Sequence, residues 1–219
     1  MTAEPDAEVA ARRDAAADLG AALRELGDSA VRTKVDADVL RAVTEQVRGL
    51  VPELGEDRRT RGEKATADSP SVRMYNPATG PGSPIAPPMS VEVRDGVAVG
   101  TCELGLAYEG PPSYVHGGIS ALLLDQVLGH AHAASGRGAG MTAELTLRYR
   151  GPVPLCTPLR VVGQVVGTRH DRWTDVRATI TTQQDPDTEL VEGNGIFVVP
   201  SPEQVERLFG EVRRKRAVR

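Results

Sequence analysis

The sequence predicts an α+β fold in which an antiparallel sheet wraps around one long central helix, with a helical extension at the N-terminus. Two strand-like segments, one apolar helical segment and four more strand-like segments follow one another after about residue 89. Short connections between consecutive strands favour an antiparallel sheet, and a lone helix among them buries its apolar surface best against that sheet. The preceding residues have helical spacing instead.

Residues 5–50 predict two amphipathic helices, which together form a helical extension over residues 1–51. Asp36 is suited to cap the second helix, and Pro52 is expected to end it. The apolar residues that recur every three or four positions are Ala16, Leu19, Leu23 and Leu26 in the first helix, and Val39, Leu40, Val43, Val47 and Leu50 in the second.

The composition changes after the extension. Proline, glycine and charged residues dominate residues 52–74, which are expected to form a linker or a wrapping loop. The sheet and its helix are expected over residues 75–200, and a C-terminal helix or tail over residues 201–219.

The sheet domain begins with a predicted hairpin, MSVEVRDGVAVGTCELG, that turns at Asp95-Gly96. Residues 117–134 form the helix candidate. Four strand-like runs complete the domain: AELTLRYR, LRVVGQVVGTR, WTDVRATITTQ and ELVEGNGIFVVP. In the first of these runs, Ala143, Leu145, Leu147 and Tyr149 are expected on one face.

Bulk composition excludes several function classes. The net charge of −4 and the aromatic content of 3% argue against a nucleic-acid partner. No stretch approaches the roughly 18 apolar residues of a membrane span, so no membrane partner is expected. Cys102 and Cys156 lack a metal-type spacing, which indicates free thiols in a reduced compartment and predicts a cytoplasmic location.

The start of the helix candidate carries two glycines, Gly117 and Gly118. The first-turn N–H groups of a helix have no intrahelical acceptor, and glycine lets a ligand approach them closely. These amides are suited to bind a carbonyl oxygen that gains negative charge. The alternative is that the glycines only allow a tight entry into the helix.

Asp125 interrupts a nearly apolar stretch of the same helix. A carboxylate there is costly unless it is paired, solvated in a cleft or functional; the alternative is a helix edge that faces solvent. Gly117 and Asp125 lie eight residues apart, which corresponds to roughly 12 Å along one helix. If both are catalytic, two copies must pack so that the helix start of one lies beside the aspartate of the other. This predicts a homodimer, and a dimer of dimers stays open.

The stretches YEGPPSYVHGGISALLLDQVLG and MTAELTLRYRGPVPLC resemble the hot-dog-fold acyl-CoA thioesterases. The subgroup is the one that contains the phenylacetate-pathway thioesterases and the mammalian carboxyl-terminal modulator protein. The likeness covers about residues 75–200 and rests on HGG followed at a fixed distance by an acid. It implies a hot-dog fold and the hydrolysis of a fatty or aromatic acyl-CoA to the free acid and coenzyme A.

The resemblance also implies site residues. Asp125 matches the catalytic acid, which acts as a general base or as a nucleophile. Gly117 and Gly118 match the amides that polarise the thioester carbonyl from the opposing subunit. Thr142 matches a residue that holds the attacking water, although a plain threonine at a strand entry is the alternative. His116 matches a histidine that shapes the helix start.

One position departs from the family pattern. Several relatives carry Asn or Asp about six residues before the histidine, where this chain has Gly110. Arg148 and Arg150 are candidates to bind the phosphates of coenzyme A, or ordinary solvated charges. No metal and no separate cofactor is expected, because coenzyme A is part of the substrate.

Two other functions stay open. A hot-dog enoyl-CoA hydratase pairs an aspartate with a histidine five residues later, as Asp125 and His130 are spaced. The Asn-Pro turn of those enzymes is missing, however, and five residues turn the two side chains about 140° apart on one helix. The third possibility is a non-catalytic acyl-CoA-binding protein.

Overall fold

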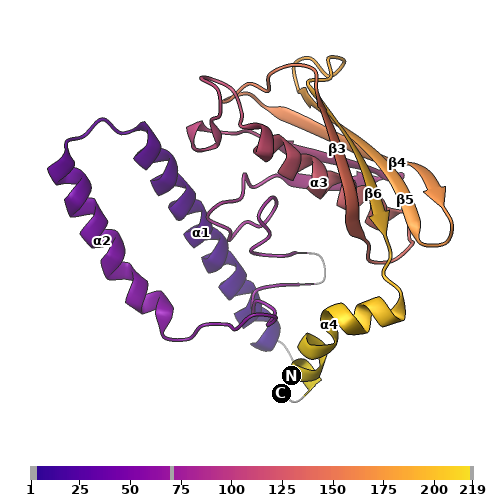
Figure 1. Cartoon of the computed structure of the whole chain (residues 1–219). Coiled ribbons are helices and arrows are strands. Elements are labelled where there is room, and N and C mark those ends of the chain that lie inside the picture. The colour runs from indigo at the N-terminus through magenta and orange to yellow at the C-terminus, as the bar shows by residue number, and fades with distance from the viewer. Residues whose placement is uncertain (1–3, 70–71, 218–219) are drawn as a thin grey trace.

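The computed structural model describes residues 4–69 and 72–217. Within them, one six-stranded antiparallel sheet curves around a single long helix, which confirms the predicted fold class (Figure 1). The strands lie in the order β1 (Ser90–Arg94), β2 (Val97–Cys102), β4 (Leu159–Arg169), β5 (Trp173–Thr182), β6 (Val191–Val198) and β3 (Met141–Tyr149).

The first hairpin turns where the sequence predicts. Asp95 and Gly96 both have positive φ, 51° and 78°, as a two-residue turn of this hand requires. The turn pairs Arg94 with Val97 and fixes the register of β1 on β2. The Asp95-Gly96 turn thereby places β1 as the edge strand of the sheet, next to β2.

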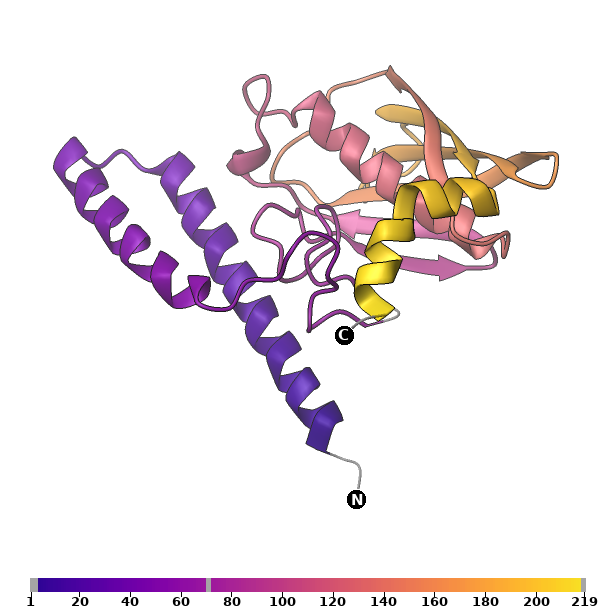
Figure 2. The same ribbon diagram turned by 60° about the horizontal axis from the view of Figure 1, so that its bottom comes forward.

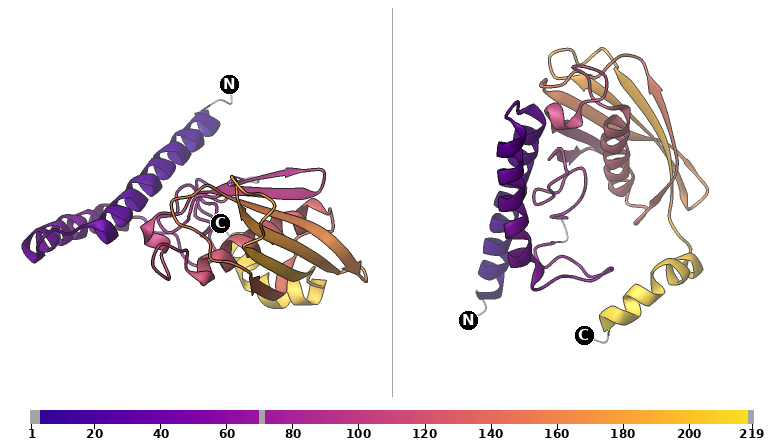
Figure 3. Two further views of the ribbon diagram at one scale, coloured as in Figure 1. Left: turned by 90° about the horizontal axis from the view of Figure 1, so that it is seen from above. Right: turned by 60° about the vertical axis from the view of Figure 1, so that its left-hand side comes forward.

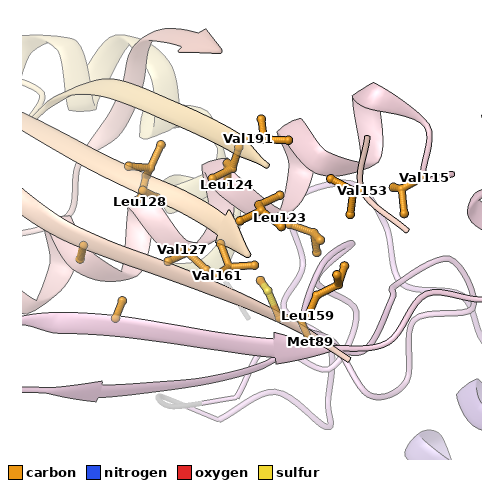
Figure 4. Packing of buried hydrophobic residues seen from close by; sticks show 14 of the residues in the cluster. Met89, Val115, Leu123, Leu124, Val127, Leu128, Val153, Leu159, Val161 and Val191 are labelled. Atoms are coloured by element: carbon orange, nitrogen blue, oxygen red, sulfur yellow. The ribbon is translucent and has the colours of Figure 1, made fainter. Parts of the chain in front are cut away.

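The central helix, α3, spans Gly117–Ala134, the residues predicted for it. Leu123, Leu124, Val127 and Leu128 are fully buried against the inner face of the sheet (Figure 4). Because this face of α3 lies against the sheet, Asp125 and Gln126 are left on flanks of the helix that are only half-buried.

Strand β3 contains a bulge that decides which way Thr142 points. The register between β3 and β6 shifts between Thr142 and Glu144, so Ala143 has no partner of its own. Strict alternation would put Thr142 on the outer face with Glu144. With the bulge, Thr142 pairs with the buried Phe197 and therefore faces α3. Of the residues expected on one face of this strand, Leu145 packs on the core as predicted. The prediction is wrong for Ala143, which is exposed.

The N-terminal helices stand beside the sheet domain and project away from it (Figures 2 and 3). Helix α1 spans Glu4–Arg32 and docks through Gly20, which approaches the backbone of Pro81 and Gly82 closely. Arg24 donates to the carbonyls of Pro81 and Ser83 at 2.8 and 2.6 Å.

Helix α2 spans Ala37–Gly55 and has no buried residue. Asp36 caps it as predicted, because its side chain accepts from the N–H groups of Asp38 and Val39. The prediction that Pro52 ends the helix is wrong, since three further residues are helical. The carbonyl of Arg48, which loses its donor at Pro52, lies on an exposed helix where water can bind it.

The chain between α2 and β1 packs on the domain instead of hanging free. Met74, Ala78 and Ala86 are buried, and the side chain of Asn76 accepts from the N–H groups of Ala78 and Thr79. After β6, helix α4 spans Pro202–Ala217. None of the helices in the described part of the chain combines the length and apolarity that a membrane crossing requires.

Candidate active site

Asp125 and Thr142, both predicted site residues, are in direct contact. The Thr142 hydroxyl donates to Oδ1 of Asp125 at 2.8 Å. The other carboxylate oxygen has no hydrogen-bond partner among the described residues. A half-buried carboxylate with one oxygen fixed and the other available can accept a proton from a bound water.

The start of α3 is organised by His116, which is its N-cap residue. The Nδ1 atom of His116 accepts from the Gly118 N–H at 3.0 Å, and its carbonyl accepts from the Ile119 N–H at 2.9 Å. The Gly117 N–H, by contrast, meets no acceptor in the part of the chain that the structure describes. Of the two predicted amides, one is therefore open and one is held by the histidine ring.

Tyr149 is a neighbour of this helix start that the sequence did not single out. Its hydroxyl donates to the Gly117 carbonyl at 2.9 Å. A Cβ at Gly117 would lie 3.2 Å from the Tyr149 hydroxyl oxygen. The Gly117 carbonyl and the Gly118 N–H belong to one peptide group, so this bond also polarises the Gly118 N–H. The sequence places Tyr149 on the inward face but carries no signal for this contact.

One chain does not bring the two halves of the site together. Gly117 and Asp125 lie on the uninterrupted helix α3, roughly 12 Å apart along its axis. A thioester carbonyl bound at the first amide therefore lies beyond reach of a water on the aspartate of the same chain.

Comparison with known proteins places these residues in a family. The model of the thioesterase superfamily matches residues 113–187, which include the glycines, Asp125 and Thr142. A crystal structure of a thioesterase superfamily protein is 35% identical, with a TM-score of 0.71, over 84% of this chain and 94% of that one. The chain belongs to the thioesterase superfamily.

Curated relatives agree with this membership. Acyl-coenzyme A thioesterase THEM4 of Mus musculus is 33% identical over 100 residues, which are 46% of this chain and 42% of the relative. THEM4 of Bos taurus is 32% identical over 99 residues, 44% and 38% respectively. The chain thus matches less than half the length of these relatives. The predicted family and hot-dog fold are confirmed.

In this superfamily member, the departure at Gly110 has a steric reason. A Cβ at Gly110 would lie 2.7 Å from the Cα of His116, so an Asn or Asp there would displace the residue that caps α3. The neighbouring Glu109 does not replace it, because its Oε1 accepts from the Ser113 N–H at 2.7 Å and closes the preceding turn.

Arg148 and Arg150, the candidates for binding the phosphates of coenzyme A, do not lie near Asp125 of the same chain. Arg148 lies opposite Glu192 in the register between β3 and β6, on the outer face of the sheet. The Arg150 guanidinium forms ion pairs with Glu192 and, at 3.7 Å, with Glu189. Asn194 and Arg150 hydrogen-bond to Glu192 and lower the pKa of its carboxyl to about 2. Arg150 is therefore engaged in a surface network, whereas Arg148 forms no ion pair with the residues that the structure describes.

The two histidines near the end of α3 differ in their surroundings. His132 is 2% exposed and stacks on Phe197, with ring centroids 5.2 Å apart. His130 is half-buried, and burial lowers the pKa of both rings. Within residues 4–69 and 72–217, no group of three or more His, Cys, Asp or Glu side chains is arranged to hold a metal ion.

Proposed function

We propose that this chain is an acyl-CoA thioesterase that hydrolyses a fatty or aromatic acyl-CoA to the free acid and coenzyme A. The observation that carries the proposal is the Thr142–Asp125 hydrogen bond on the helix side of the sheet, in a member of the thioesterase superfamily. The curated relatives named acyl-coenzyme A thioesterase support the same reaction.

In the proposed reaction, Asp125 takes a proton from a water that Thr142 helps to hold, and the water oxygen attacks the thioester carbon. The carbonyl oxygen becomes an oxyanion that accepts hydrogen bonds from the amides at the start of α3. The Gly117 N–H is open for this role, and the Gly118 N–H joins it when the His116 ring turns away. Collapse of the intermediate breaks the C–S bond, and the thiolate of coenzyme A leaves and takes up the proton.

The proposed site lies between two copies of the chain. Its acid comes from one copy and its amides from the other, because one helix separates the two groups by roughly 12 Å. Strand β3 supports this arrangement: it is the last strand of the sheet, so one of its edges has no partner strand among the described residues. An open edge of this kind is suited to pair with its twofold copy. We therefore propose a homodimer with two equivalent sites.

The proposed enzyme works with water alone, without a metal or a cofactor, in a reducing cytoplasm. Both cysteines are free thiols. Burial raises the pKa of the Cys102 thiol to about 12, which keeps it protonated and unreactive. Cys102 therefore has no part in the proposed hydrolysis.

Release of free thiol from a panel of fatty and aromatic acyl-CoAs tests the function. Asp125→Asn keeps the size of the side chain but removes the base, so we expect at least about a 100-fold loss of kcat. Asp185→Asn, on the exposed turn after β5, serves as the control and should keep wild-type rates.

Other results would contradict the proposal. Hydration of an enoyl-CoA without thiol release would indicate a hydratase, although α3 runs without interruption between Asp125 and His130 and turns these side chains apart. Binding of acyl-CoA with neither reaction would indicate a non-catalytic binding protein.

A further inference from the structure

A groove of about 1040 Å³ lies between α1, the end of α2 and the segment that follows α2. All of its lining residues precede residue 76, and none belongs to α3 or to the sheet. The groove is therefore separate from the candidate active site. Figure 3 shows the helices that form its walls, standing clear of the sheet.

Four large apolar side chains lie together in this groove, which is open to solvent and is otherwise lined mainly by polar and charged residues. These four side chains are called its apolar floor. They belong to Leu19, Val51, Leu54 and Tyr75 and are 42%, 54%, 61% and 44% exposed. Large apolar side chains on a soluble protein are usually scattered, and their gathering in one concavity is typical of a binding site.

Four cations surround the same floor: Arg12, Arg58, Arg59 and Lys64. None of them forms an ion pair with the residues that the structure describes. The ion pairs that the described residues form with one another all lie outside the groove. The Arg59 guanidinium lies over the ring of Tyr75, 5.4 Å from its centroid, which holds it at the edge of the apolar floor. Two carboxylates, Asp57 and Glu63, line the groove as well, so its lining carries a formal charge of +2 (four cations less two anions) in a chain with a net charge of −4. This local excess of positive charge favours an anion.

We propose that the groove binds one single-chain carboxylate, a free fatty acid, with its chain on the apolar floor and its carboxylate against the arginines. The volume of about 1040 Å³ slightly exceeds the usual range of roughly 300–1,000 Å³ for small-ligand pockets, so one long acyl chain has room in it. A planar guanidinium pairs with a carboxylate through two parallel hydrogen bonds. The proposal of this site does not depend on the proposed hydrolysis. The proposed hydrolysis would, however, produce free acids of this class.

Calorimetric titration of the full chain with dodecanoate, below its micelle concentration, tests the proposal. We expect Leu54→Glu and Arg59→Glu each to weaken binding at least tenfold. Matched controls on the same helical hairpin, Leu40→Glu and Arg41→Glu, lie outside the groove and should bind as the wild type does. Dodecanol, which lacks the charge, should bind at least tenfold more weakly than dodecanoate.

Several outcomes would overturn the proposal. Absence of dodecanoate binding is one, and binding that neither groove substitution changes is another, because the acid would then bind elsewhere. A change in oligomeric mass in Leu54→Glu, with dodecanoate binding unchanged, would make the groove a contact between subunits. Thiol release by the groove variants should equal that of the wild type, so a failed enzyme and a failed groove give different results.

Discussion

The peptide group between Gly117 and Gly118 is held at both of its ends. Tyr149 donates to its carbonyl, and His116 accepts from its N–H. The preceding amide, that of Gly117, has no such partner among the described residues. At the scale of single residues, the proposed oxyanion site thus has one open donor, the Gly117 N–H, and a second donor, the Gly118 N–H, that becomes available only when the His116 ring turns away.

Replacing Gly117 by proline tests the open donor. Proline is well tolerated at the first position of a helix, and His116 already has the extended conformation that a residue before proline adopts, with φ −59° and ψ 133°. Gly117→Pro therefore removes the N–H while it keeps the helix, and we expect kcat to fall about 100-fold. Gly117→Ala keeps the N–H. Its Cβ would lie 3.2 Å from the hydroxyl oxygen of the exposed Tyr149 side chain, which can shift to make room, so activity should stay within a few-fold of wild type. Equal activity of the two variants in the thiol assay would exclude this amide as the donor.

Most of the candidate residues were visible in the sequence, but their contacts were only partly so. Asp125 stands out because apolar residues surround it, and the helix start stands out because of its two glycines. The contact of Thr142 with Asp125 depends on the bulge at Ala143, which a pattern of alternation cannot reveal. Tyr149 reaches Gly117 only because β3 returns past the helix start.

At the scale of elements, α3 was predictable at both ends, whereas α2 was not. The apolar face of α3 and its histidine cap agree with each other, so local preference and packing indicate the same limits. Helix α2 has no buried residue, and the sequence alone does not show that its last turn lies exposed to water. That exposure makes the proline tolerable and moves the end of the helix past Pro52.

Two glycines of α1 give a matched test of how this helix docks. A Cβ at Gly20 would lie 2.5 Å from the carbonyl oxygen of Pro81, whereas a Cβ at Gly27 would meet nothing within 4 Å. Gly27→Ala should raise the free energy of unfolding of the helix by up to about 1 kcal/mol, because alanine favours a helix interior. Gly20→Ala should instead lower the stability of the docked helix. Hydrogen exchange of the α1 amides measures both effects. Faster exchange in Gly27→Ala would contradict the prediction that alanine at this open position stabilises the helix.

At the scale of the whole molecule, the buried His132 and the half-buried His130 link stability to pH. Burial lowers the pKa of His132 below its ordinary 6.5, so the unfolded chain holds more protons than the folded one just below that pH. Stability is fully present above pH 6.5 and falls as the pH drops toward the folded pKa. The lowered pKa of Glu192, about 2, acts only below its ordinary 4.5 and leaves the interval from pH 7.5 to 5 to the histidines.

Urea unfolding at pH 7.5 and pH 5 measures this dependence. We expect the free energy of unfolding to be lower at pH 5 than at pH 7.5, and the difference to shrink in His132→Leu. His170→Asn is the control, because His170 is exposed and asparagine tolerates its positive φ of 55°. An undiminished difference in His132→Leu would assign the effect to other groups.

The assembly of the proposed site sets the last test. If the acid and the amides of each site come from different copies, one dimer holds two sites, and each site takes its acid from one chain and its amides from the other. Asp125→Asn and Gly117→Pro are then each inactive alone. A mixed dimer, however, contains one site built from the intact aspartate of one chain and the intact amide of the other.

Random exchange of the two variants makes half of all dimers mixed, each with one of its two sites intact, so about one quarter of wild-type activity should return on mixing. Separate affinity tags on the two chains allow the mixed dimer to be isolated, and its thiol release should be about half that of the wild-type dimer. A site within a single chain predicts a different result, because every chain in the mixture carries a defect. A mixture that stays inactive although mixed dimers are present would therefore place the acid and the amides in the same chain.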